Sequence, residues 1–457
     1  MDLISKAVKE HRNFFQTGKT IDIEFRRDSL KKLQDALLRY ENEIYDAFWE
    51  DLRKPKLEVF GTEIGMVLKE IKHHLKKLNK WAKPTRISTD MLNFYSTSRI
   101  LHEPYGVVLI MSPWNYPLQL ALLPLVGALS AGNCVMMKPA HYSANVSDLI
   151  KKLLTEIFPP EYVSVITGDR NVNQAVLDQR FDLIFFTGSP SLGRIVMEKA
   201  SKHLTPVVLE LGGKSPCIVE QDADLDVAAQ RISFGKFLNS GQTCIAPDHL
   251  FVHREVKDRL LLKIRGCIKH FYGDDPEQSP DFGRIINARQ FDRLEKLMHS
   301  AGTIIHGGRV NRAARYVEPT IIDNINYSDP IMQEEIFGPL LPVLEFTSLE
   351  DVIAMINKHE KPLAMYFFTS SKSKRDLLLS STSSGGGCIN DTVMHVSNPN
   401  MPFGGVGNSG MGCYHGKFSF DAFSHHRSIL QKTTIFNPTI PYPPYKNKLS
   451  YLKPFLS

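Results

Sequence analysis

After the Lys83-Pro84 pair, the sequence alternates short apolar runs with stretches of helical periodicity, and this alternation limits the folds that are open to the chain. The first runs are GVVLIMSP, NCVMMKP, VSVITG, DLIFFTG and PVVLELGG. Continuous apolar runs of this length, each followed by a helix, are typical of parallel strands that are buried on both faces. We therefore predict an α/β fold built on a parallel sheet.

A second series of apolar runs follows the helix expected at 222–238, and it predicts a second α/β domain. Its strands are HLFVH, PTIID, LLPVLEF, LAMYFFT and GGCIND. We expect the boundary near Val208 to Lys214, where an apolar strand runs into a pair of glycines. Before both series, from about Leu3 to Trp81, apolar residues recur at helical spacing and predict a helical N-terminal segment.

Composition narrows the class of protein. A chain of 457 residues that is 42% hydrophobic can form two or three domains around a large core. Its net charge of +6 comes from interleaved charges, so nucleic acid binding is not implied. The six cysteines are scattered without metal-ligand spacing, and we interpret them as reduced thiols. Without a signal-peptide core or a long apolar run, the chain is expected to be cytoplasmic and free of membranes.

The segment FFTGSPSLG predicts a strand that ends at Gly188-Ser189, before a helix that begins near Ser191. The N–H groups and the dipole at such a helix start favour an anion, for which phosphate is the obvious candidate. Its G-S-x-x-x-G spacing is looser than the dinucleotide fingerprint, and a glycine turn before a helix is also an ordinary structural feature. Lys138, which ends the strand NCVMMKP, is either a ligand for ribose or phosphate or a solvated lysine.

Cys244 lies in FGKFLNSGQTCIAP, just after a helix that Gly241 is expected to end, so its thiol is placed on a loop. A buried inert thiol is the alternative, and it suits the cysteines of the apolar strands better. The preceding helix presents the negative end of its dipole, which raises the pKa of a thiol. A base, N–H donors or a cofactor charge would therefore have to activate Cys244.

Two further polar residues stand at strand ends. Glu210 interrupts the apolar run PVVLELGG, where burial would raise its pKa and suit it to act as a general base. A solvated glutamate or a salt bridge is an equal alternative. Asn115, in MSPWNYP, could donate a hydrogen bond to an oxyanion near Cys244, although asparagine next to proline also forms turns.

Seven motifs, taken together and in order, resemble the aldehyde dehydrogenase superfamily across nearly the whole chain: PWNYP, KPA, FTGSPSLG, ELGGKSP, NSGQTC, EEIFGP and MPFGGVGNSG. The short N-terminus and the tail NPTIPYPPY look like the class 3 branch, whose members are commonly homodimers. The resemblance implies an aldehyde dehydrogenase-like α/β fold. Its expected parts are a Rossmann-variant cofactor domain, a second α/β catalytic domain and a small oligomerisation element.

The resemblance divides the chain into three parts. Residues 1–208 would form the NAD(P)-binding domain, with the helical segment and a strand segment near 85–104 that is used in oligomerisation. Residues 209–410 would form the catalytic domain, and residues 411–457 a C-terminal oligomerisation segment and tail.

The resemblance also implies catalytic functions for three residues. Cys244 would be the nucleophile, Glu210 the general base, and Asn115 with the Cys244 N–H the oxyanion hole. The implied contacts to NAD or NADP are of three kinds. The turn beneath the pyrophosphate would consist of Gly188, Ser189 and Gly193, and the ribose hydroxyls would be bound by Lys138 and Glu335. Phe337 would pack near the nicotinamide ribose.

In the implied cycle, Cys244 adds to an aldehyde, hydride leaves the tetrahedral centre, and water activated by Glu210 hydrolyses the thioester to the acid. No metal is required. A dehydrogenase that passes the acyl group to coenzyme A, or a binding protein of the same fold, is the alternative. Relatives that use coenzyme A generally lack the glutamate, and a binding protein would be expected to lose the nucleophile or the base.

One position departs from the family pattern. Many relatives carry glutamate three residues beyond Lys138, where it favours NAD over NADP, but this chain has His141. We therefore expect the use of both NAD and NADP, unless His141 points into solvent and selects nothing. The resemblance suggests medium-chain aliphatic or aromatic aldehydes as substrates and a homodimer as the assembly.

Overall fold

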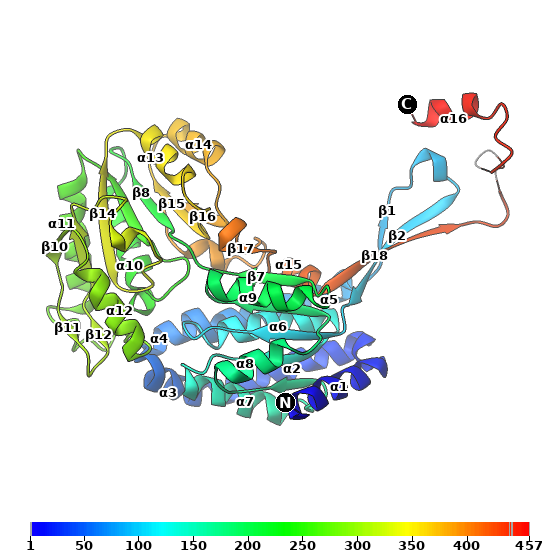
Figure 1. Cartoon of the computed structure of the whole chain (residues 1–457), viewed down its shortest axis with the longest axis horizontal. Helices are drawn as coiled ribbons and strands as arrows, with labels where there is room; N and C mark the ends of the chain where they lie inside the picture. The colour runs from blue at the N-terminus through cyan, green and yellow to red at the C-terminus, as the bar shows by residue number, and fades with distance from the viewer. Residues whose placement is uncertain (1, 438, 440–441, 457) are drawn as a thin grey trace.

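The computed structural model describes residues 2–437, 439 and 442–456, and its strands form three main sheets (Figure 1). The first sheet has six strands in the order β17-β7-β6-β3-β4-β5. Five strands, β3 to β7, run parallel, and β17 is antiparallel to β7. In chain order they are β3 (Val107–Met111), β4 (Cys134–Lys138), β5 (Val163–Val165), β6 (Leu183–Thr187), β7 (Val207–Glu210) and β17 (Gly410–Met411).

Helices connect these parallel strands, as the alternating pattern predicts. They are α6 (Gln119–Ala131), α7 (Ala144–Ile157), α8 (Arg170–Leu177) and α9 (Pro190–Ser201). All residues of α6 are buried, including Pro124, so this helix lies inside the molecule. The strand order runs outward in both directions from β3, and the carboxyl ends of such strands border a crevice that suits a ligand.

The second sheet has seven strands in the order β10-β13-β14-β9-β8-β15-β16. Its members are β8 (Pro216–Val219), β9 (His249–His253), β10 (Thr303–His306), β13 (Thr320–Asp323), β14 (Leu340–Phe346), β15 (Ala364–Phe368) and β16 (Gly386–Ile389). Its helices are α10 (Leu225–Phe237), α11 (Lys257–Tyr272), α12 (Ala288–Met298), α13 (Leu349–Asn357) and α14 (Lys372–Ser381). A small hairpin pairs β11 (Val310–Asn311) with β12 (Tyr316–Val317).

The N-terminal segment is helical, in agreement with its periodicity. It contains α1 (Asp2–Gln16), α2 (Ile23–Arg39), α3 (Glu41–Leu52), α4 (Lys56–Val59) and α5 (Gly65–Trp81). Between α4 and α5, residues Phe60–Ile64 form a π-helical turn, η2. Such turns often occur at functional sites, and this one lies beside α6.

A third sheet forms an arm that projects from the body of the molecule (Figure 1). It contains β1 (Thr85–Ile87), β2 (Ser96–Pro104) and β18 (Ser424–Lys432), all antiparallel. Strand β18 follows the short helix α15 (Lys417–Ala422), and α16 (Leu449–Leu456) lies beyond it. None of the described helices is long and apolar enough to cross a bilayer.

The transition between the first two sheets differs from the expected division at 208/209, which falls within β7. Glu210 still belongs to the first sheet, because its carbonyl accepts the Gly188 N–H at 2.9 Å and its backbone pairs with Gly410. The chain joins the second sheet only at Pro216. The expected division between the catalytic domain and the C-terminal segment, at 410/411, falls within β17, which pairs with β7.

Candidate active site

The side chain of Glu210 is buried at the end of β7. It is 2% exposed, and neither carboxylate oxygen has a hydrogen-bond partner among the described residues. Burial raises the pKa of Glu210 well above its usual value. A carboxyl group in this state is unusual for a purely structural residue, because buried polar groups are normally paired.

Cys244 lies on the loop after α10, as its sequence context predicts. Burial raises the pKa of its thiol, and the charges of Glu335 and Glu210 raise it further. The backbone N–H groups of Cys244 and Ile245 act in the opposite direction, because they stabilise the thiolate. The structure therefore brings the nucleophile candidate, the buried Glu210 and the partly buried Glu335 into one electrostatic environment.

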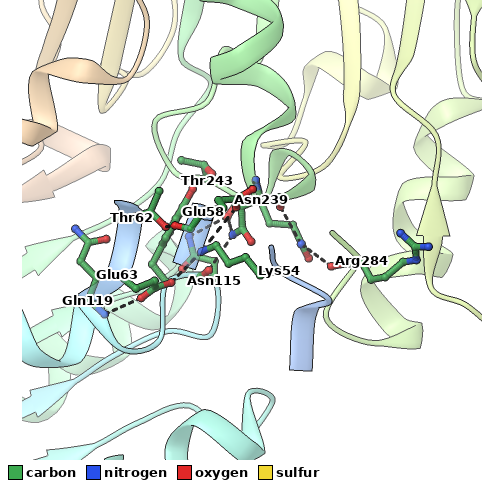
Figure 2. Close-up of polar contacts among 11 residues, drawn as sticks. Lys54, Glu58, Thr62, Glu63, Asn115, Gln119, Asn239, Thr243 and Arg284 are labelled. Carbon is green, nitrogen blue, oxygen red and sulfur yellow. Dashed lines mark hydrogen bonds and ion pairs between the residues drawn. The ribbon is translucent and has the colours of Figure 1, made fainter. Parts of the chain in front are cut away.

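The amide of Asn115 faces the same loop. Its Nδ2 donates to the Gln242 carbonyl at 3.0 Å, two residues before Cys244. Asn239 joins the two segments, because its Nδ2 donates to the carbonyl of Asn115 (Figure 2) and also to that of Gln242. The hydroxyl of Tyr116 lies 2.6 Å from Oγ1 of Thr243. Asn115 and the residues that precede Cys244 are thus fixed relative to each other.

The turn between β6 and α9 has the form expected for an anion site. Ser189 caps α9, and its Oγ accepts the Leu192 N–H at 3.4 Å. A Cβ at Gly188 would lie 2.6 Å from the ring of Phe186, and a Cβ at Gly193 would lie 2.8 Å from Leu211. Both glycines therefore allow close packing at the start of the helix.

Lys138 is buried at the end of β4, where its Nζ donates to the Pro139 carbonyl at 2.8 Å. Burial lowers the pKa of Lys138 to about 8. His141 is exposed, and its ring contacts the ring of Tyr142. Partial burial and then the charge of Lys138 lower the pKa of His141. The imidazole is therefore largely neutral near pH 7.

Glu335 faces Gly212, and a Cβ at that glycine would overlap a carboxylate oxygen of Glu335. Its Oε1 is buried without a hydrogen-bond partner among the described residues, and burial raises its pKa to about 8. Phe337 has a left-handed backbone, with φ 50°, and its ring lies edge-on to Trp114 at 5.3 Å. This contact joins the loop that contains Asn115 to the one that contains Glu335.

The sequence analysis missed an ion pair that fixes the Glu335 loop. Lys214 pairs with the buried Asp248 and also donates to the carbonyls of Ile331 and Glu334. The second oxygen of Asp248 accepts the Ile336 N–H at 2.8 Å. The motif ELGGKSP contains Lys214 directly after its glycine pair, so the sequence did carry a signal for this residue.

Two hydroxyl groups at strand ends were also missed. Ser112 follows β3 and Thr187 ends β6, and the oxygen of each side chain is buried without a partner among the described residues. Both lie at the carboxyl edge of the first sheet, where nucleotides bind in folds of this kind. Together with Oε1 of Glu335, they offer hydrogen-bonding capacity that suits a polar cofactor.

The profile of the aldehyde dehydrogenase family matches residues 2–429. The chain belongs to this family. The dehydrogenase is 46% identical over 456 residues to 4,4'-diaponeurosporen-aldehyde dehydrogenase of Staphylococcus aureus, a match that covers 100% of this chain and 99% of the relative. It is 42% identical to the dimeric NADP-preferring aldehyde dehydrogenase of Rattus norvegicus over 435 residues, which are 95% of this chain and 96% of the relative.

A solved structure agrees with these matches. AldH of Staphylococcus aureus, solved in a substrate-bound state, superimposes on this chain with a TM-score of 0.98 at 46% identity, and the match covers 100% of both chains. The predicted fold class and the predicted membership of the aldehyde dehydrogenase superfamily are confirmed. The protein is an NAD(P)-dependent enzyme that oxidises aldehydes to carboxylic acids.

Proposed function

We propose that Cys244 is the nucleophile of this dehydrogenase, that Glu210 is its general base, and that Asn115 helps to form the oxyanion hole. One observation carries the assignment. Glu210 has a buried carboxyl group without a partner among the described residues, and its charge acts directly on the pKa of the Cys244 thiol. A structural glutamate would need a compensating donor in such a place.

Asn115 has the geometry to stabilise the tetrahedral centre. Its Nδ2 carries two hydrogens, and the one donated to Gln242 fixes the plane of the amide. The other hydrogen and the Cys244 N–H can then be donated to the oxyanion that forms when the thiolate adds to an aldehyde. Because the donors are fixed in advance, they need no reorganisation during the reaction.

Glu210 acts in the second half of the reaction, in which water hydrolyses the thioester. When bound, NAD(P) would accept the hydride that leaves the tetrahedral centre, and the acyl group would then remain on Cys244 as a thioester. Glu210 removes a proton from a water molecule that attacks this thioester, and the acid is released. A pKa raised by burial makes the carboxylate a stronger base than a solvated glutamate.

The residues at the carboxyl edge of the first sheet fit the cofactor. Ser189 and the glycines at 188 and 193 would lie beneath the pyrophosphate, where the start of α9 favours an anion. Lys138 would bind ribose hydroxyls at the same edge. From the loop before β14 of the second sheet, Oε1 of Glu335, which has no partner among the described residues, would also bind ribose hydroxyls, and Phe337 would pack near the nicotinamide ribose.

The dehydrogenase would use both NAD and NADP. A glutamate at position 141 would repel the additional phosphate of NADP, whereas the largely neutral His141 removes this repulsion without adding a strong attraction. Lys138 adds nearby positive charge. The rat relative is described as NADP-preferring, which agrees with acceptance of NADP by this branch of the family.

Medium-chain aliphatic or aromatic aldehydes are the proposed substrates, and a cytoplasmic homodimer is the proposed form of the enzyme. A panel of these aldehydes, compared by kcat/KM, tests the substrate class. The panel should include 4,4'-diaponeurosporen-aldehyde, for which the staphylococcal relative is named. A kcat/KM for this compound far above all others would replace the proposed class.

The deciding experiment follows the absorbance of reduced nicotinamide after an aldehyde is added, with and without coenzyme A. We expect turnover that does not need coenzyme A, and we expect Cys244→Ser to lose it while cofactor binding remains nearly intact. Strict dependence on coenzyme A would contradict hydrolysis by Glu210. Substantial turnover by Cys244→Ser would remove Cys244 from the mechanism.

A further inference from the structure

A buried cluster of charges lies beside the proposed active site, on the N-terminal segment. Lys54, between α3 and α4, is 1% exposed, and its Nζ lies 2.9 Å from Oε1 of the fully buried Glu63. Glu58 is the second carboxylate, 3.9 Å from the same Nζ and 13% exposed. Burying three ionisable groups is unfavourable unless each is well paired, so their other contacts are informative.

One side of this charge cluster holds the loop that contains Asn115. Oε2 of Glu63 accepts the Gln119 N–H at 2.8 Å, at the start of α6 (Figure 2). Nζ of Lys54 lies 4.0 Å from the ring centroid of Tyr116, a cation–π contact next to Asn115. Lys54 and Glu63 thus fix both ends of the short segment from Asn115 to Gln119.

The other side holds the loop that contains Cys244. Oε1 of Glu58 accepts the Asn239 N–H at 2.9 Å. The Asn239 side chain then donates to the carbonyl of Asn115 at 2.8 Å and to that of Gln242 at 3.1 Å. Glu58 is therefore bonded to the residue that joins the two loops.

The backbone of the Cys244 loop needs such support. Asn239 and Ser240 have φ values of 53° and 52°, and Gly241 continues at 73°. Two successive residues with side chains in the left-handed region are unfavourable, and such conformations persist only where their surroundings hold them. Loss of the bond from Glu58 would leave this turn free to relax and to move Cys244.

We propose that Glu58, oriented by Lys54, is a positioning residue that holds Asn115 and the Cys244 loop in the arrangement needed to stabilise the oxyanion. The inference rests on the proposed functions of Asn115 and Cys244. It gives the N-terminal helical segment a part in catalysis that its sequence did not indicate. Glu58 itself is bonded to Asn239, so it acts on Cys244 through the loop.

The test compares Glu58→Gln with Glu58→Leu. Glutamine keeps an oxygen that can accept the Asn239 N–H, whereas leucine has a similar size and no acceptor. Thr62→Ala is the matched control, because Oγ1 of Thr62 bonds to the backbone carbonyl of Glu58 on the same turn and not to its carboxylate. For each variant we would measure kcat, the rate of the first burst of reduced nicotinamide, the cofactor Kd and Tm.

We expect Glu58→Leu to slow both the burst and kcat by about tenfold to a hundredfold, the size expected for a displaced catalytic group, with the cofactor Kd unchanged. Glu58→Gln and Thr62→Ala should stay within about threefold of the parent enzyme, since neither removes the acceptor. Equal losses in the glutamine and leucine variants, or a parental burst rate in Glu58→Leu, would overturn the proposal.

A second variant covers the case in which Glu58→Leu fails to fold. Asn239→Gly keeps the backbone N–H and tolerates the left-handed φ, but it removes the amide bonds to Asn115 and Gln242. We expect the same slow burst, and a parental burst would contradict the inference. The parent enzyme and Cys244→Ser test the proposed function separately, so failure of the positioning proposal alone would leave their results unchanged.

Discussion

At the scale of single residues, the carboxyl group of Glu210, which has no hydrogen-bond partner among the described residues, leads to a kinetic prediction. We expect Glu210→Gln to keep the burst of reduced nicotinamide and to lose about a hundredfold or more of the steady rate, because an amide cannot accept the proton from water. Rapid-mixing absorbance measures both phases. If the burst and the steady rate fell equally, Glu210 would have to act before the thioester forms.

The pH profile of the parent enzyme provides a second check on Glu210. A general base works only when deprotonated, and burial raises the pKa of this carboxyl group. Deacylation should therefore begin to fail, as pH falls, at a higher pH than a solvated glutamate would allow. A steady rate that stays constant down to pH 5 would contradict a raised pKa.

His141 gives a prediction about cofactor choice. In His141→Glu, the new carboxylate should lower kcat/KM for NADP by up to about fivefold relative to NAD, the effect of a partly exposed charge pair. The measurement compares kcat/KM for both cofactors in the parent and the variant. An unchanged ratio, or a parent that cannot use NADP, would show that His141 is not the selector.

Among the site residues, charge in an apolar context was the most useful sequence signal. It drew attention to Glu210, and of the alternatives left open for this residue the structure shows the buried one. It did not identify Lys54 or Glu63, because charged residues in a helical segment are usually on the exposed face. Their burial depends on α6, which packs against α5 and η2, and this contact between helices cannot be read from local periodicity.

At the scale of elements, α1 is tied to the first sheet by a buried histidine. Nδ1 of His11 lies 2.9 Å from the Glu161 carbonyl, and Nε2 lies 2.7 Å from Oγ of Ser164 on β5. Burial lowers the pKa of His11 from 6.5 to about 4. Between these two values the unfolded chain binds more protons than the folded one, so stability falls as pH falls.

We therefore expect His11→Gln to reduce the acid sensitivity of folding. Between pH 7 and pH 4, the free energy of unfolding of the parent should fall by up to about 3 kcal/mol more than that of the variant, on the basis of the change in pKa. Urea denaturation at several pH values measures the difference. The control is His299→Gln at an exposed position, and a parallel pH dependence in the parent and His11→Gln would refute the prediction.

Most strands of the two large sheets could be predicted because they are short apolar runs, but β8 and β10 were not among the expected strands. The two-residue strand β17 could not be predicted, since its pairing with β7 depends on a long return of the chain. The antiparallel arm was expected only as a strand segment near 85–104. Its pairing with β18 joins distant parts of the sequence, and alternation within either strand does not reveal the partner.

At the scale of the whole molecule, the exposed tail leads to a prediction about assembly. Phe436, Tyr442, Tyr445 and Tyr451 are exposed beyond the arm, and such aromatic surface is typical of contacts with other chains. Residues 438, 440–441 and 457 of the predicted oligomerisation tail lie outside the described residues. The rat relative is described as dimeric.

We expect a homodimer at micromolar concentration in a sedimentation experiment. Truncation after Lys432 should shift the enzyme toward monomer, because it removes these exposed aromatic residues. A monomer or a stable tetramer of the full chain would reject the predicted homodimer. An unaltered dimer after truncation would place the interface elsewhere.

The arm also has a consequence for synthesis of the chain. Strand β2 ends at Pro104 and its partner β18 begins at Ser424, so one edge of β2 stays unpaired until the chain between these two residues has been made. At the usual rates of translation, this interval lasts roughly 15 to 65 s. Unpaired edges promote aggregation. The arm is therefore completed only after β18 has been made, and the free edge of β2 is open to pairing with other chains during that interval.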